Sequence, residues 1–510
     1  MAASPSEQRW TLAVAVLGSS LAFLVSSVVN VALPAIQRDL GASAPTMQWV
    51  VNAYLLFLGA LLLAGGAAGD RYGERRVFGW GLAVFAFATL GCALAPSSAL
   101  LIGARAVQGV GAALLVPVSL ALLTAVFPPG ERGRAVGTWA GFSALTTAFG
   151  PALGGWLVDV LSWRAVFWPL VPLALLTLGL SRKVPETHPS EEGPLDKLGA
   201  LLATVGLGGL AAGLIRAGER GWTDGLVLAG LGGGAVLLVL FVFQERRAEA
   251  PLLPLGLFRS RVFTGANLLT LALYFALYGA LFFLPFHLIQ VQGMTAAEAG
   301  LAFLPFSLVM ASLSRWAGGL LDRVGARLPL TVGPLLVAAG FVLLMRPGVE
   351  ANYWTTFFPA LLVIGIGMAT AVAPLTTVVL NAAPDEHAGA ASGVNNAAAR
   401  VAGLLAVAVL GVVALTVFEP ALASRLASLD APAATRDAVW AARADLAAAA
   451  DAVDGAPAVV AAVGAAFVAA FRLVAGLCAG LAALAAAFAW VLLRDGPTDR
   501  AGPRRVDGPS

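Results

Sequence analysis

Four arginines lie inside long apolar stretches of this 510-residue chain, at positions Arg105, Arg315, Arg400 and Arg472. A guanidinium at the centre of a bilayer costs about 2.5–3.5 kcal/mol on insertion scales, so it usually faces a polar cavity and has a partner. None of the 28 acidic residues falls in the middle of such a stretch. This pattern favours a cavity that accepts neutral or anionic groups over cationic ones.

Residues for enzyme chemistry are scattered. The three histidines, His188, His287 and His387, form neither a metal-spaced cluster nor part of a triad. An ATP-driven pump would need Gly-x4-Gly-Lys-Ser/Thr, and neither Lys183 nor Lys197 sits in such a loop. We therefore expect no enzymatic activity, no metal and no cofactor.

The first motif surrounds Arg105 in the string Leu101-x3-Arg105-x2-Gln108-Gly109-x-Gly111. Gln108 shares a helical face with the arginine, and the glycines open space beside it. The alternative is that Arg105 extends to the nearer membrane surface, about two helical turns away. We favour the interpretation that Arg105 and Gln108 face a cavity.

A second motif occurs twice. Gly-Ala-Ala-Gly-Asp-Arg-Tyr-Gly, from Gly66 to Gly73, recurs as Gly-Gly-Leu-Leu-Asp-Arg-Val-Gly, from Gly318 to Gly325. Such a turn can cap a neighbouring helix with its carboxylate and pair its arginines with acids across one membrane face. One copy could be a generic charged turn, but two at matched positions predict a latch that holds one conformation and releases in another. The predicted latch consists of Gly66, Asp70, Arg71, Gly73, Arg75, Arg76, Asp322, Arg323 and Gly325.

A third motif joins a proline to three glycines, as Gly150-Pro151-x2-Gly154-Gly155. Proline removes a backbone hydrogen bond and bends a helix. The glycines allow a second helix to approach closely. We expect a bent helix that packs tightly at an interface between two domains.

These motifs need membrane helices to position them. Of all residues 59% are hydrophobic and 12% are charged, about half the charged share of a soluble chain. Apolar windows of about 20 residues predict an all-α integral membrane protein with fourteen spans. They lie at 11–33, 47–67, 77–95, 99–125, 133–158, 163–181, 197–216, 225–244, 262–290, 297–320, 328–345, 354–380, 388–418 and 462–493.

The charges in the loops orient this layout. Most of the 31 lysines and arginines fall in loops on the same side as the N-terminus, so both termini are expected in the cytoplasm. The apolar run 10–33 is too long for a signal-peptide core, so we expect it to remain as the first helix. A net charge of +3 gives no indication of nucleic-acid binding.

In this order and spacing, the three motifs resemble those of the major facilitator superfamily. The Pro-Gly motif is similar to the antiporter signature of its drug exporters, and two extra central helices resemble the fourteen-helix drug:proton antiporter branch. Three further strings look like that branch: Val28 to Ile36, Trp49 to Tyr54, and Ala390 to Arg400. The resemblance covers about residues 10 to 493.

The resemblance implies the major facilitator fold, with two six-helix bundles and two extra central helices. We expect export of small amphiphilic compounds, such as drugs and antibiotics, by alternating access, with protons exchanged in return. The expected parts are a cytoplasmic N-terminus (1–9), an N-terminal bundle (10–182), a linker with the extra helices (183–261), a C-terminal bundle (262–493) and a cytoplasmic tail (494–510). The external loop 419–461 is expected to form a short amphipathic hairpin that caps the outer face.

The sequence departs from that branch in its first helix. Val25 occupies the position at which an aspartate is usual, so the resemblance does not supply the residue for proton coupling. Asp159 and Glu298 are the carboxylates we select as candidates, with His287 as a third. The residues predicted for the cavity and for coupling are Arg105, Gln108, Asn30, Asn52, Tyr54, Asn395, Asn396, Arg400, Asp159 and Glu298.

An alternative stays within the same fold. The chain could export a lipid, a metabolite or a natural product, neutral or anionic, with atypical coupling. In either case the expected partners are an amphiphilic small molecule, protons and the lipid bilayer. We expect a monomer in the bacterial inner membrane.

Overall fold

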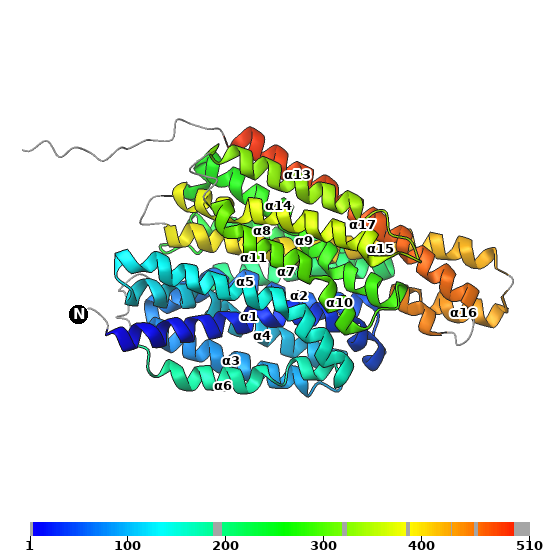
Figure 1. The fold of residues 1–510 in the computed structure, drawn as a ribbon, viewed down its shortest axis with the longest axis horizontal. Helices are drawn as coiled ribbons and strands as arrows, with labels where there is room; N and C mark the ends of the chain where they lie inside the picture. Colours follow the sequence, from blue (N-terminus) through cyan, green and yellow to red (C-terminus); the bar gives the residue numbers. More distant parts are fainter. Residues whose placement is uncertain are drawn as a thin grey trace, which may run out of the picture.

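The computed structural model describes residues 4–186, 196–318, 324–383, 388–429, 431–452 and 457–493. Within these ranges all regular structure is helical, and the long helices run side by side in one elongated bundle (Figure 1). The N-terminus lies at one end of the bundle, which we call the N-terminal end. The short helix α16 (Ala433–Ala441) lies at the other, which we call the α16 end.

The first six helical segments form one half of the molecule. They are α1 (Pro5–Leu40), α2 (Ala44–Tyr72), α3 (Glu74–Ala93), α4 (Ser98–Val126), α5 (Pro129–Val160), and the short η1 (Trp163–Val166) followed by α6 (Leu170–Ser181). The serines that precede α2 and α4 accept hydrogen bonds from the first-turn amides Thr46 N and Leu100 N. These bonds satisfy amides that have no partner within the helix, and so fix where each helix begins.

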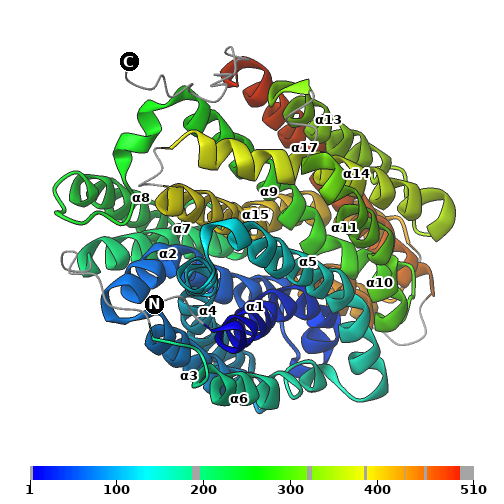
Figure 2. The same cartoon turned by 60° about the vertical axis from the view of Figure 1, so that its left-hand side comes forward.

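The other half begins at α9. It consists of α9 (Arg261–Phe286) with the π-helical η3 (His287–Val291), α10 (Ala296–Ala302), α11 (Leu304–Gly318), α13 (Arg327–Leu343), α14 (Tyr353–Asn381), α15 (Ala388–Ala427) and α17 (Pro457–Leu492). The two halves lie side by side in both views, the first half below and the second half above (Figure 1 and Figure 2). We call this interface the seam. It pairs α5 with α10 and α11, and α2 with α15.

A helical hairpin separates the halves in the sequence. α7 (Lys197–Arg220) and α8 (Gly225–Glu245) pack on each other, and α7 also contacts α2 of one half and α15 of the other. α8 carries many exposed apolar side chains, among them Leu228, Val236 and Leu240. A helix that is apolar on its exposed face is expected where hydrocarbon covers it.

Twelve helices of the described residues are long and apolar enough to cross a membrane. The expectation of an all-α membrane protein is confirmed by these helices. α5 and the shorter apolar α13 lie in the same bundle. That these two also cross the bilayer, which would make fourteen spans, remains a prediction.

The structure refines three of the expected segments. The helix expected at 297–320 is interrupted at Phe303, between α10 and α11, while 296–313 remains one candidate span. The span 262–290 ends in the π-helical turn at His287–Val291. Within the loop expected at 419–461, α15 continues to Ala427, and alanine-rich sequence with high helix propensity accounts for this extension.

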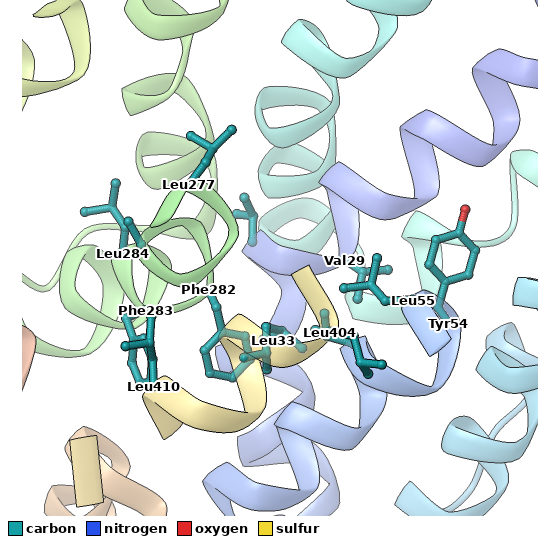
Figure 3. Close-up of a cluster of buried hydrophobic side chains, with 14 of the residues drawn as sticks. Val29, Leu33, Tyr54, Leu55, Leu277, Phe282, Phe283, Leu284, Leu404 and Leu410 are labelled. Atoms are coloured by element: carbon teal, nitrogen blue, oxygen red, sulfur yellow. The ribbon is translucent and has the colours of Figure 1, made fainter. Parts of the chain in front are cut away.

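Apolar side chains from both halves fill the seam near its centre. Figure 3 shows residues of α1 and α2 facing residues of α9 and α15. Tyr54, Leu55, Phe282 and Leu404 are each at most 2% exposed. Polar groups in this region are therefore surrounded by hydrocarbon, where an unpaired donor or acceptor is costly.

Candidate functional site

Arg105 is buried inside the first half and has three partners. Its Nε donates to the Val50 carbonyl at 3.0 Å and its Nη1 donates to Gln108 Oε1 at 2.7 Å. Its guanidinium carbon lies 4.3 Å from the centre of the Tyr54 ring, in a cation–π contact. Because the side chain is 1% exposed, the alternative that it extends to the membrane surface is wrong.

Gln108 and Tyr54 extend this network to the surrounding helices. Gln108 Nε2 donates to Thr89 Oγ1 of α3 at 2.8 Å, and the Tyr54 hydroxyl donates to the Ala22 carbonyl of α1 at 2.8 Å. The network thus joins α1, α2, α3 and α4, and it orients the guanidinium without a carboxylate partner in the described residues. Sequence reasoning selected Arg105, Gln108 and Tyr54. It missed Thr89, and it missed Val50 and Ala22, which contribute backbone carbonyls.

Arg400 lies at the seam. Its Nη1 donates to the Tyr278 hydroxyl of α9 at 2.7 Å, and its guanidinium carbon lies 5.6 Å from the Phe23 ring centre of α1. A Cβ at Gly59 of α2 would lie 3.0 Å from the Arg400 Cβ. Arg400 therefore lies beside α1 and α2 of the first half while it bonds α9 of the second half.

The predicted asparagines have different environments. Asn395 donates to Asn267 Oδ1 and Thr270 Oγ1 within the second half, whereas Asn396 is exposed and bonds its own helix at Ser392. Asn52 is fully buried, and neither its amide nitrogen nor its oxygen has a hydrogen-bond partner. Asn30 is half-buried on α1. The asparagines therefore do not form one cluster.

The two candidate coupling carboxylates meet at the beginning of α10. Asp159, near the end of α5, accepts from the backbone amides of Ala296 at 3.0 Å and Ala297 at 2.7 Å, across the seam. Glu298 accepts from the Thr295 amide at 2.9 Å and so caps its own helix. Of these two carboxylates, Asp159 is the one that connects the two halves.

Two glycines allow the close approach of α5 and α10. A Cβ at Gly155 would overlap the Ala296 carbonyl oxygen, and a Cβ at Gly300 would overlap the Pro151 carbonyl oxygen. The other two glycines of the motif, Gly150 and Gly154, contact α1 instead, at Ser27 and Val28. The predicted tight packing at the domain interface is observed at Pro151 and Gly155.

A second polar connection crosses the α16 end. Gln37 at the end of α1 donates to the backbone carbonyl of Asp445 at 3.1 Å, and its Oε1 accepts from Gln290 Nε2 at 3.2 Å. Asp445 lies in η5 (Arg443–Ala452), which packs against α2, α15, α17 and η3. The segment expected to cap the outer face thus contacts both halves. Gln37 was missed because a single glutamine in an apolar run gives no signal.

Two arginines of the first Asp-Arg turn pair with one glutamate that follows the first half in the sequence. Arg75 Nε lies 3.1 Å and Arg76 Nε 3.6 Å from Glu186 Oε2, in the segment after α6. Asp70 is exposed at the end of α2, and Arg71 stacks on Tyr72 at 5.8 Å. Gly66 faces α4, where a Cβ would lie 3.6 Å from Pro117. Glu186 was not predicted, because its position in an acidic linker indicated no pairing.

The second turn is described only in part, since Asp322 and Arg323 lie outside the described residues. Gly325 has a φ of +76° and Gly73 a φ of +93°, a region that favours glycine. The repeated motif therefore ends at a glycine with positive φ in both halves.

His287 is enclosed by aromatic rings. Its ring centre lies 5.2 Å from that of Phe357 and 4.7 Å from that of Phe471, and the side chain is fully buried. Its Nδ1 lies 3.5 Å from Gln292 Nε2. It packs inside the second half, against α14 and α17.

Comparison with known proteins gives the family. Residues 15–407 match the model of the Major Facilitator Superfamily. The chain is 40% identical over 441 residues to the puromycin resistance protein pur8 of Streptomyces alboniger, covering 85% of this chain and 86% of that one. It is 36% identical over 406 residues to the multidrug resistance protein Stp of Mycobacterium tuberculosis, covering 79% and 75%.

A solved structure shows the same fold. A bacterial homologue of the human lysosomal transporter Spinster, in an inward-facing and unoccupied conformation, has a TM-score of 0.66 and 17% identity, covering 96% of this chain and 97% of that one. Helices, motifs and relatives agree that this is a transporter rather than an enzyme. The chain belongs to the Major Facilitator Superfamily.

Proposed function

We propose that this transporter exports small amphiphilic compounds of the antibiotic class by alternating access. The relatives named for resistance to puromycin and to multiple drugs support the substrate class. The observation that carries the mechanism is the Asp159 bond to α10, because it joins the two halves at one end through contacts that can break and reform. We place the α16 end outside the cell and both termini in the cytoplasm.

In this arrangement the conformation described here is closed on the outside. Asp159 and Gln37 hold the outer ends of the halves together, and the glycine contacts of α5 and α10 remove any gap between them. Opening outward must separate these contacts. The first Asp-Arg turn lies at the opposite end, where we propose that it holds the cytoplasmic side closed in the other conformation.

Asp159 is also our candidate for proton coupling. Protonation removes the negative charge that accepts two backbone amides, and a charge-assisted bond is about twice as strong as a neutral one. A proton arriving from outside would thereby favour the outward-open conformation. Glu298 caps α10 without crossing the seam, so it is assigned a structural role.

The test is transport in proteoliposomes with an imposed pH gradient, over cationic, neutral and anionic amphiphiles. Proton antiport requires that the gradient drives uptake of substrate into inverted vesicles and that a protonophore abolishes it. Uptake that is insensitive to the gradient in the wild type would exclude antiport. Equal drug susceptibility of a deletion strain and its parent would exclude drug export.

A second substrate class is favoured by Arg400. This arginine bonds a tyrosine at the seam, and Val25, at the position where a first-helix acid is usual, is fully buried. A positively charged seam attracts anionic or neutral amphiphiles, such as natural products or lipids, in preference to cations. The same panel of substrates distinguishes the two classes.

A further inference from the structure

A pocket of about 400 Å³ opens between α3 and α6 at the N-terminal end of the bundle. Figures 1 and 2 both place these helices side by side at the outer edge of the first half, away from the seam. The residues that line it include Arg75, Arg76 and Arg182 at the helix ends and Gly79, Trp80 and Leu178 deeper along the helices. It is therefore separate from the transport pathway between the halves.

The rim of the pocket is positively charged. Three arginines face it, and Glu186 is the carboxylate recorded beside them, at 3.1 Å from Arg75 and 3.6 Å from Arg76. The Arg76 side chain is 64% exposed, and Arg182 is exposed as well. Among the described residues that line the pocket, three carry a guanidinium group and none carries a carboxylate, so with Glu186 beside them the rim is net positive and can receive an anion.

The deeper part of the pocket is apolar. Gly79 and Leu178 line this part together, and a Cβ at Gly79 would be in van der Waals contact with Leu178 Cδ1, at 3.7 Å. Trp80 is 52% exposed and lies 6.1 Å from the Tyr72 ring. Tryptophan and tyrosine concentrate at the level of the lipid headgroups. The pocket thus combines a cationic rim at headgroup level with an apolar groove that runs into the hydrocarbon.

We propose that this pocket binds an anionic phospholipid of the cytoplasmic leaflet. Its phosphate would accept hydrogen bonds from Arg76 and Arg182, and one acyl chain would lie along Gly79 and Leu178. Basic pockets between membrane helices on the cytoplasmic side are suited to acidic headgroups. A zwitterionic lipid offers an ammonium group as well, which the three arginines would repel.

The test is native mass spectrometry of the full-length protein, with phosphatidylglycerol and phosphatidylcholine competing in the same detergent. We expect preferential retention of phosphatidylglycerol. Arg182→Gln should lower it about fivefold, the factor for one arginine beside an anionic lipid. Arg247→Gln, also exposed at this end but outside the pocket, is the matched control and should leave retention unchanged. Gly79→Leu should fill the groove and lower retention with all charges kept.

Thermal unfolding separates a lipid from a simple anion. Phosphatidylglycerol should raise the melting temperature of the wild type, and inorganic phosphate at the same concentration should not. Three outcomes would each overturn the proposal. The two lipids could be retained equally, Arg182→Gln and Arg247→Gln could lower phosphatidylglycerol retention equally, or phosphate could raise the melting temperature as much as the lipid does. Since Arg182 is exposed, its variant is expected to fold even if Gly79→Leu does not.

Discussion

The carboxylate of Asp159 lies 2.7 Å from the backbone nitrogen of Ala297, although the two residues belong to opposite halves of the transporter. In the proposed mechanism this contact, with its neighbour at Ala296, determines how firmly the end that we place outside the cell is closed. We expect Asp159→Ala to shift the conformational equilibrium toward outward-open by about five- to tenfold, since a bond to a charged group is worth about 1.5–3 kcal/mol when buried and less when exposed. Spin labels at the exposed positions Val160 and Leu301 would report a longer distance.

The control for this experiment is Glu298→Gln. Glu298 caps the same helix but only from within it, so its removal should leave the distance distribution unchanged. An equal shift in both variants would mean that capping of α10, and not the connection between halves, keeps the outer end closed.

The close contact between α5 and α10 should affect transport as strongly as the hydrogen bonds of Asp159. Gly155→Ala places a methyl group against the Ala296 carbonyl, and such overpacking costs about 1–3 kcal/mol. We expect transport to fall about tenfold while the helical content by circular dichroism is kept. Gly141→Ala, in the same helix with nothing within 4 Å of the new methyl group, should transport normally. Loss of transport in both variants would show that substitution anywhere in α5 impairs transport, so that the contact with α10 is not the cause.

Arg400 should influence which substrates are carried. We expect Arg400→Gln to lower the ratio of anionic to cationic substrate transport about tenfold, because a buried charge at the seam is removed. Tyr278→Phe removes the 2.7 Å hydrogen bond and keeps the charge, so it should preserve the ratio. Initial rates in proteoliposomes for a matched anionic and cationic pair would measure it. An unchanged ratio in Arg400→Gln contradicts a role in selection.

Arg105 should contribute to stability. Arg105→Ala removes the donor to Gln108 Oε1 and to the Val50 carbonyl, and we expect a loss of about 2–4 kcal/mol in the free energy of unfolding. Arg105→Lys keeps the charge but loses the planar guanidinium over Tyr54, so it should recover only part of the loss. Thermal unfolding in detergent measures both variants. Full recovery by lysine would show that charge alone suffices.

The cap at the α16 end should respond to pH. Burial and the nearby Asp451 raise the pKa of Asp445 from 3.8 to about 6. The docked cap therefore favours the protonated carboxyl, and its stability is highest below about pH 4 and falls as the pH rises toward 6. Hydrogen exchange in residues 433–452, corrected for the intrinsic rate, should accelerate over this range. Asp445→Asn should abolish the change, and Asp437→Asn, at an exposed position, should retain it.

The helices and the fold class could be predicted from the sequence, because twenty-residue apolar windows and repeated turns are strong local signals. The burial of Arg105 beside Gln108 was also expected, since both lie on one face of one helix. The partners across the seam were not predictable in this way. The pairing of Asp159 with Ala296 uses backbone amides, which every sequence offers equally, and the partner Glu186 of Arg75 lies in a linker without periodicity.

The hairpin of α7 and α8 touches both halves at once. A Cβ at Gly208 of α7 would lie 3.2 Å from Leu56 of α2, and one at Gly218 would lie 3.0 Å from Leu415 of α15. When α2 and α15 change their relative tilt, α7 cannot follow both, so it must slide along at least one of them. The turnover rate of this transporter should consequently depend on how freely α7 slides along α2 and α15.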